Sequence, residues 1–188
     1  MTSLSQQPQT DAPQFDNDTD VPVLIALFNS TFEDFNTRLV LGNDEPVYLP
    51  ASEACSYHQI VFAHGFFSSA LHEIAHWCIA GEARRLQEDY GYWYCPDGRD
   101  EKQQASFEKV EIKPQAIEWA FTEAAGRRFQ VSTDNLNGAE PDRDGFTKNV
   151  AQQRSLYEQH GYPKRAARFI EALKATFSNR TQIGASVA

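Results

Sequence analysis

Cysteine and long apolar runs are both scarce in this sequence. Its 188 residues include three cysteines, Cys55, Cys78 and Cys95, with no C-x-x-C pair among them. An odd and widely spaced set argues against a disulfide framework and predicts reduced thiols in a cytoplasmic protein. No stretch approaches the length of a membrane span, and residues 1–20 lack both a basic start and an apolar run. We therefore expect a cytoplasmic protein with no signal peptide and no membrane contact.

Basic residues are also in the minority. The chain has 17 Lys and Arg against 26 Asp and Glu, which gives a formal net charge of −9. A protein that follows the phosphates of a nucleic acid needs a concentrated basic patch. The composition therefore argues against direct nucleic-acid binding and mildly favours a cationic partner.

Hydrophobic residues make up 41% of the chain and aromatic residues 12%, which predicts a globular fold with a sizeable core. Residues 1–20 are polar and contain proline, so we expect a disordered tail, and residues 179–188 resemble a shorter one. Between these tails we expect a single α+β domain over residues 21–178, rich in helix and with a small sheet.

Apolar periodicity and turn residues predict the elements of this domain. Helices are expected at residues 23–40, 69–80, 114–126, 146–160 and 163–177. Extended segments are expected at residues 45–51, 58–64 and 107–113. In this interpretation Pro114 opens the third helix, because proline is favoured in a first helical turn.

His72, Glu73 and His76 form the motif H-E-x-x-H in the helix expected from Ser69. Helical positions four apart lie on one face, so the two imidazoles can bind the same divalent ion. At 100° per residue, both histidines lie along one edge of the apolar stripe. That stripe consists of Leu71, Ile74, Ala75 and Cys78. The pattern predicts a half-buried metal site, with two ordinary hydrogen-bonded histidines as the alternative.

Two histidines leave an ion under-coordinated, so a third protein ligand is expected. In the helix expected after Pro114, Glu118 flanks the apolar stripe as His72 flanks its own. Glu123 falls on the opposite side and should face solvent. Glu118 is therefore the expected third ligand.

A set of two histidines and one glutamate permits different chemistries. With zinc, the ion activates water and Glu73 serves as the general base of a peptidase or nuclease. With Fe(II), two histidines and one carboxylate leave open positions for O2. A third alternative is a translation-associated binding protein whose structural ion is closed by four protein ligands. The short motif alone favours the peptidase.

Longer segments around the motif are more specific. The segments HGFFSSALHEIAHWCIAGEARR, DYGYWYCPDGRD, FEKVEIKPQAIEWAFTEAAG and FQVSTDNL resemble the bacterial elongation factor P hydroxylase family. The resemblance implies a non-haem Fe(II), O2-dependent hydroxylase of the monooxygenase type. Its implied substrate is the β-lysylated lysine of translation elongation factor P. The resemblance also implies a fold like that of small H-E-x-x-H metal hydrolases, with His72, His76 and Glu118 on the iron.

Further residues are expected near the metal. Glu73 is close enough to act on a metal-bound ligand and is the expected catalytic residue. An aromatic loop is expected to wall the site and contact the aliphatic part of the substrate, although core packing is the alternative. Its residues are Tyr90, Tyr92, Trp93 and Tyr94.

Overall fold

The computed structural model describes residues 18–43, 45–91, 97–133, 135 and 137–184, with residues 178–184 as backbone. Its helices are α1 (Val21–Thr31), α2 (Phe67–Ile79), α3 (Glu101–Ala124), α4 (Arg143–His160) and α5 (Lys164–Gly184). Its strands are β1 (Thr37–Leu41), β2 (Val47–Leu49) and β3 (His58–Phe62), and two short 3-10 helices are η1 (Glu33–Phe35) and η2 (Arg84–Leu86). The predicted helix-rich α+β domain is confirmed.

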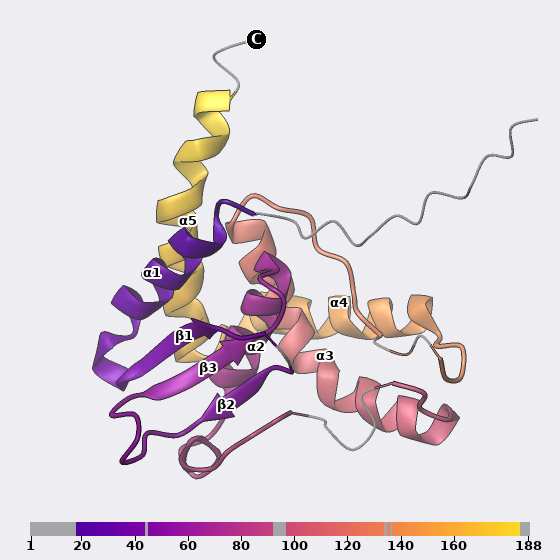
Figure 1. The fold of residues 1–188 in the computed structure, drawn as a ribbon. Coiled ribbons are helices and arrows are strands. Elements are labelled where there is room, and N and C mark those ends of the chain that lie inside the picture. Colours follow the sequence, from indigo (N-terminus) through magenta and orange to yellow (C-terminus); the bar gives the residue numbers. More distant parts are fainter. Residues whose placement is uncertain (1–17, 44, 92–96, 134, 136, 185–188) are drawn as a thin grey trace, which may run out of the picture.

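The three strands form one sheet in the order β1-β3-β2, with β1 parallel and β2 antiparallel to β3. Leu39, Ile60 and Phe62 are buried and belong to the same hydrophobic core as α1, α2 and α5. Helix α2 contacts both β3 and α3. Figure 1 shows the strands on one side of the molecule, α3 and α4 on the other, and α2 between them. The H-E-x-x-H helix therefore runs through the centre of the domain.

The outer edge of β2 is closed by a short bridge and two prolines. Tyr48 and Asp89 exchange backbone hydrogen bonds of 2.8 and 3.0 Å. Backbone groups alternate in direction along a strand, so positions 46 and 50 face outward as Tyr48 does. Both positions are proline and carry no N–H. This edge therefore offers no regular row of donors to another strand.

An aromatic cluster fixes the end of α2. The ring of Trp77 lies 4.8 Å from that of Phe32 and 5.4 Å from those of Phe28 and Phe35, each in a near-perpendicular arrangement. Such edge-to-face contacts add specific geometry to the burial of apolar area. Trp77 directly follows His76, so this packing sets the orientation of the last helical turn.

Two arginines complete the same helix end. Arg165 of α5 donates to the carbonyls of Trp77, Cys78 and Ala80 at 2.8, 3.1 and 2.6 Å. Arg85 donates to the carbonyl of Ala80 at 2.8 Å. The last carbonyls of a helix have no partner within the helix and carry partial negative charge, so cations stabilise them.

Helix α3 differs most from the sequence-based prediction. The strand expected at residues 107–113 and the helix start expected at Pro114 are both wrong, because one helix runs from Glu101 to Ala124 with Pro114 inside it. Asp100 accepts from the backbone N–H of Gln103, whose side chain accepts from the backbone of Asp100. This reciprocal cap starts the helix six residues before the segment interpreted as a strand (107 − 101).

The buried face of α3 explains the error. Before Pro114 its buried residues are Gln104, Phe107 and Glu111, of which only Phe107 is apolar, whereas the buried apolar residues Ala116, Ile117 and Phe121 all follow Pro114. The part before Pro114 therefore gives no apolar periodicity, whereas Phe107, Val110 and Ile112 suggested alternation.

The remaining differences are one missed strand and the positions of some element ends. Helix α1 stops at Thr31, and residues 37–41, expected to continue the helical spacing, form β1 after Asn36, whose φ of 48° is left-handed. Helix α5 continues to Gly184, into the segment expected as a tail. Residues 1–17 of the expected N-terminal tail lie outside the described residues. Strands β2 and β3 and helices α2 and α4 confirm the predictions for those segments.

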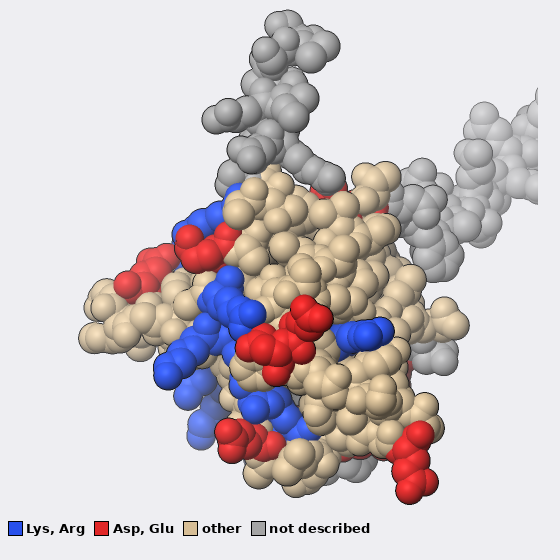
Figure 2. Space-filling view, turned by 90° about the vertical axis from the view of Figure 1, so that its left-hand side faces the viewer, with Lys and Arg blue, Asp and Glu red and all other residues tan. Residues whose placement is uncertain are grey.

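The surface pairs many of its charges. Figure 2 shows Lys and Arg gathered over part of one face, with Asp and Glu beside them. Ion pairs between elements include Arg168 with Asp34 at 2.9 Å and Arg154 with Glu123 at 2.6 Å. In the part of the chain that the structure describes, no helix has the length and apolar character needed to cross a membrane.

Candidate metal site

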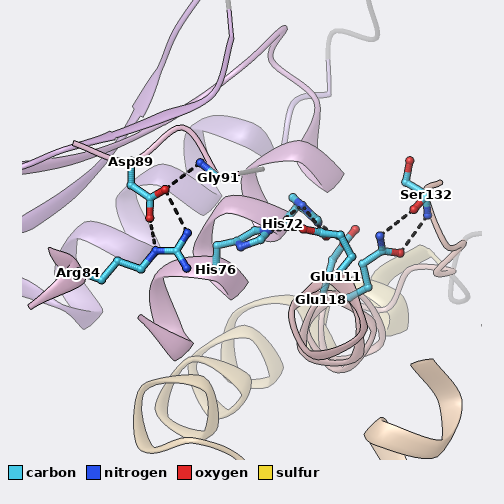
Figure 3. Close-up of polar contacts among 9 residues, drawn as sticks. His72, His76, Arg84, Asp89, Gly91, Glu111, Glu118 and Ser132 are labelled. Atoms are coloured by element: carbon cyan, nitrogen blue, oxygen red, sulfur yellow. Dashed lines mark hydrogen bonds and ion pairs between the residues drawn. The ribbon is translucent and has the colours of Figure 1, made fainter. Parts of the chain in front are cut away.

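The side chains of α2 and α3 converge on a small polar cluster (Figure 3). The Nε2 atoms of His72 and His76 lie 3.1 Å apart. Glu111 of α3 reaches both histidines, with Oε1 3.2 Å from Nε2 of His76 and Oε2 3.4 Å from Nε2 of His72. These three residues bring one ligand atom each into a common region, and Glu111 is 2% exposed.

The distances in this cluster fit one divalent ion. An ion bonded at about 2.1 Å to two ligands, with roughly 90–110° between the bonds, holds them about 3.0–3.4 Å apart. The Nε2–Nε2 separation falls in this range, as does the distance from each Nε2 atom to the nearer oxygen of Glu111. In addition, Oε2 of Glu111 is buried without a hydrogen-bond partner in the described structure. A buried carboxylate oxygen is seldom left unsatisfied, and an ion at the centre of the cluster would satisfy it.

Glu118 lies on the other side of the His72 ring. Its Oε2 accepts a hydrogen bond from Nδ1 of His72 at 2.8 Å. A carboxylate only accepts, so the proton of neutral His72 stands on Nδ1 and the lone pair of Nε2 faces His76 and Glu111. Histidines that bind metals are commonly oriented by such a carboxylate.

The arrangement therefore differs from the predicted ligand set. Glu118, expected as the third ligand, orients His72, and Glu111 occupies the place expected for Glu118. The two carboxylates are seven positions apart on α3 and lie on one face of the helix. Glu111 was not considered because its segment was interpreted as a strand. The signal that could have found it is the Asp100–Gln103 capping box, which starts the helix early enough to include it.

The prediction that the side chain of Glu123 faces solvent is confirmed. Its carboxylate is exposed and accepts from Arg154 and from the indole N–H of Trp119. These contacts, led by the hydrogen bond from Arg154, lower the pKa of Glu123. Glu123 therefore takes no part in the cluster.

The charges in the cluster are strongly coupled. Burial opposes the charged form of His72, but the charges of Glu111, Glu118 and Glu73 together raise its pKa well above the usual value. Burial also opposes ionisation of Glu111, but His76 and His72 lower its pKa to about 2. Without an ion, the site thus holds a proton on His72 against an ionised Glu111. A metal ion bound at Nε2 would replace that proton.

Glu73 lines a cavity of about 40 Å³ next to the cluster, together with His76, Tyr48 and Asp89. Burial raises the pKa of Glu73, Glu111 and Glu118 add to the effect, and the two histidines oppose it. Asp89 pairs with Arg84 and accepts from the backbone N–H of Gly91 at 2.9 Å (Figure 3). This pairing holds residues 84–91 against the cavity.

The predicted aromatic wall is described only in part. Tyr90 is 48% exposed, which excludes it from the core. Tyr92, Trp93 and Tyr94 lie outside the described residues, so their predicted contact with a substrate stays a prediction.

Comparisons with known proteins point to one family. The family model described as Elongation factor P hydroxylase matches residues 27–186. A Haemophilus influenzae protein named Elongation factor P lysine hydroxylase is 54% identical over 161 residues, which cover 85% of this chain and 90% of that protein. This chain belongs to the elongation factor P hydroxylase family. The matched range of the family includes both histidines and both carboxylates of the cluster, on α2 and α3.

Proposed function

We propose that this member of the elongation factor P hydroxylase family is an Fe(II)- and O2-dependent protein-lysine hydroxylase. Its proposed substrate is the β-lysylated lysine of translation elongation factor P, and its proposed location is the cytoplasm, with neither nucleic acid nor membrane as a partner. The observation that carries the proposal is the cluster of His72, His76 and Glu111 in a chain whose family is named for hydroxylation.

In this proposal His72, His76 and Glu111 hold the iron. Fe(II) in a site of two histidines and one carboxylate supplies the activation of O2 that hydroxylation of an unactivated carbon requires. Glu118 keeps the proton of His72 on Nδ1, which leaves Nε2 free to bind. The H-E-x-x-H helix packed between a small sheet and α3 also supports the prediction that the fold resembles small metal hydrolases.

Glu73 is the proposed catalytic acid or base. Its carboxyl group borders the same cavity as His76, within reach of a reacting group in that space. Since burial raises its pKa, the carboxyl oxygen can hold or release a proton closer to neutral pH than an exposed glutamate can. Tyr90 is proposed to contact the substrate at the mouth of the site, with Tyr92, Trp93 and Tyr94.

The test is the intact mass of β-lysylated elongation factor P after incubation with the Fe(II)-loaded protein in air. Hydroxylation consumes two electrons per turnover, so ascorbate is added as reductant. We expect a gain of one oxygen atom that is absent under nitrogen and absent with His72→Ala. An unchanged mass with full iron loading and reductant would reject the hydroxylase. Cleavage of the substrate by the zinc-loaded protein, lost in Glu73→Gln, would support the hydrolase instead.

A further inference from the structure

Gln115 of α3 is a fully buried polar residue next to the candidate metal site, with 0% of its surface exposed. Its amide makes two hydrogen bonds with the backbone of Ser132. Nε2 donates to the carbonyl of Ser132 at 2.7 Å, and Oε1 accepts from the N–H of Ser132 at 3.0 Å. A backbone N–H only donates and a carbonyl only accepts, so these two partners fix which end of the amide is the nitrogen.

One N–H of this amide remains after the contacts with Ser132, because a glutamine side chain carries two. Glu111 lies one turn earlier on the same face of α3. Burial opposes ionisation of Glu111, and its pKa is lowered first by the two histidines and then also by a hydrogen bond from Gln115. Figure 3 shows Glu111 between the histidines and Ser132. The amide of Gln115 therefore connects the carboxylate of Glu111 with the backbone of Ser132.

The backbone around Ser132 is itself fixed from the start of α3. The carbonyl of Thr133, the next residue, accepts from Nη2 of Arg99 at 2.9 Å and from Nε2 of Gln104 at 3.2 Å. Thr133 is 4% exposed and Arg99 is 1% exposed. Buried hydrogen bonds of this kind are costly to break, so Ser132 gives Gln115 a rigid support.

The chemistry of an amide suits this place. A lysine or arginine beside Glu111 would neutralise the carboxylate and compete with a cation for it. A neutral amide orients the carboxylate by hydrogen bonding and leaves its negative charge available to an ion. Carboxylates that bind metals are themselves commonly hydrogen-bonded by a neighbouring group.

We infer that Gln115 is a positioning residue, which holds the carboxylate of Glu111 in the orientation that binds an ion together with His72 and His76. The inference rests on the proposed function for the presence of a metal at these residues. Gln115 then acts on Glu111 as Glu118 acts on His72. One face of α3 thus supplies a metal ligand and, four and seven residues later, two groups that orient ligands.

The test compares Gln115→Met, which removes the amide at nearly constant volume, with Gln104→Met. Gln104 is a matched control because it is a 4% exposed glutamine of the same helix whose amide donates to Thr133 and Glu108. It lies seven residues, or about 10 Å along the helix, before Glu111. Both variants should unfold at lower urea concentration than the unsubstituted protein, so stability alone does not separate them.

Metal binding separates them, measured by titration of metal-free protein with Fe(II) and with Co(II) against a chelator. Gln115→Met should lower the affinity by about 10–100-fold, the usual effect of losing a group that orients a ligand. It should also change the absorption spectrum of bound Co(II), whereas Gln104→Met should leave affinity and spectrum unchanged. Unchanged affinity in Gln115→Met, or an equal loss in Gln104→Met, would overturn the inference.

A second variant covers the case in which Gln115→Met does not fold. Gln115→Asn keeps an amide that is one methylene shorter and cannot reach Ser132 and Glu111 together, so the same loss of affinity is expected and its absence would overturn the inference. These titrations need no substrate, which separates them from the proposed function. The expected results from a protein that does not hydroxylate elongation factor P would support Gln115 and reject the hydroxylase. Hydroxylation by a protein whose Gln115 variants bind metal normally would reject the inference alone.

Discussion

Replacing the two buried carboxylates of α3 one at a time distinguishes their roles. Glu118→Gln keeps an oxygen that accepts from Nδ1 of His72 but exchanges a charged acceptor for a neutral one. Hydrogen bonds to charged groups contribute about 1.5–3 kcal/mol and neutral ones about 0.5–1.5 kcal/mol. The expected loss of metal-binding free energy is therefore about 1–1.5 kcal/mol, or roughly five- to tenfold in affinity.

Glu111→Gln should have a much larger effect. Its two oxygens face the Nε2 atoms of both histidines and the group is 2% exposed, so the change removes a buried negative charge that lies close to both. Removing one partner of a buried charged pair costs about 3–5 kcal/mol. Metal affinity should thus fall by more than about a hundredfold.

The assay is an anaerobic titration of metal-free protein with Fe(II) against a chelator of known affinity, repeated with Co(II) for its absorption spectrum. Glu123→Gln is the control on the same helix, since that residue pairs with Arg154 at the surface, and its affinity should be unchanged. If Glu118→Gln abolished binding while Glu111→Gln stayed within tenfold, Glu118 would be the ligand and our assignment would be refuted.

Two further predictions concern stability. In metal-free protein the raised pKa of His72 stabilises the fold fully below its ordinary value of 6.5, and this contribution is lost as pH rises through the raised value. The melting temperature without metal should therefore fall above pH 6.5, whereas Fe(II) affinity should rise; a melting temperature that climbs over this range would contradict the coupling. Arg165→Met removes three hydrogen bonds to the end of α2 and should lower the free energy of unfolding by roughly 2–4 kcal/mol. Arg168→Met breaks an exposed pair with Asp34 and a contact of the guanidinium with the ring of Phe32, and should cost no more than about 1–2 kcal/mol in the same urea titration; a loss larger than that of Arg165→Met would argue against a special role of Arg165.

The sequence alone was sufficient to place the two histidines of the candidate site together, but it did not point to Glu111. His72 and His76 could be assigned together because their spacing of four is fixed within a single helix turn and needs no tertiary information. Glu123 could be excluded by the same helical phase. These inferences use local geometry alone, and the structure agrees with them.

Glu111 could not be identified from the periodicity of apolar residues. Before Pro114 only one of the buried residues of α3, Phe107, is apolar, so the usual sign of a buried helix face was missing there, and Pro114 suggested a helix start. Proline costs roughly 3 kcal/mol in a helix interior, yet packing against α2, α4 and α5 keeps α3 continuous. Strand β1 was missed for a related reason, because the apolar spacing of α1 continued across the left-handed turn at Asn36.

The proposed metal ligands lie on two separate helices, which would affect the lifetime of the protein in the cell. His76 and Glu111 are 35 positions apart in the chain (111 − 76), and an ion bound to both closes that stretch into a loop. Closing a loop of this length lowers the conformational entropy of the unfolded chain. This stabilises the folded state by about 3–4 kcal/mol, as a disulfide does. If the proposed site holds iron, a cell short of iron would keep this protein in its less stable form, which opens to proteases more often. The amount of enzyme, and not only its activity, should then follow the supply of the metal.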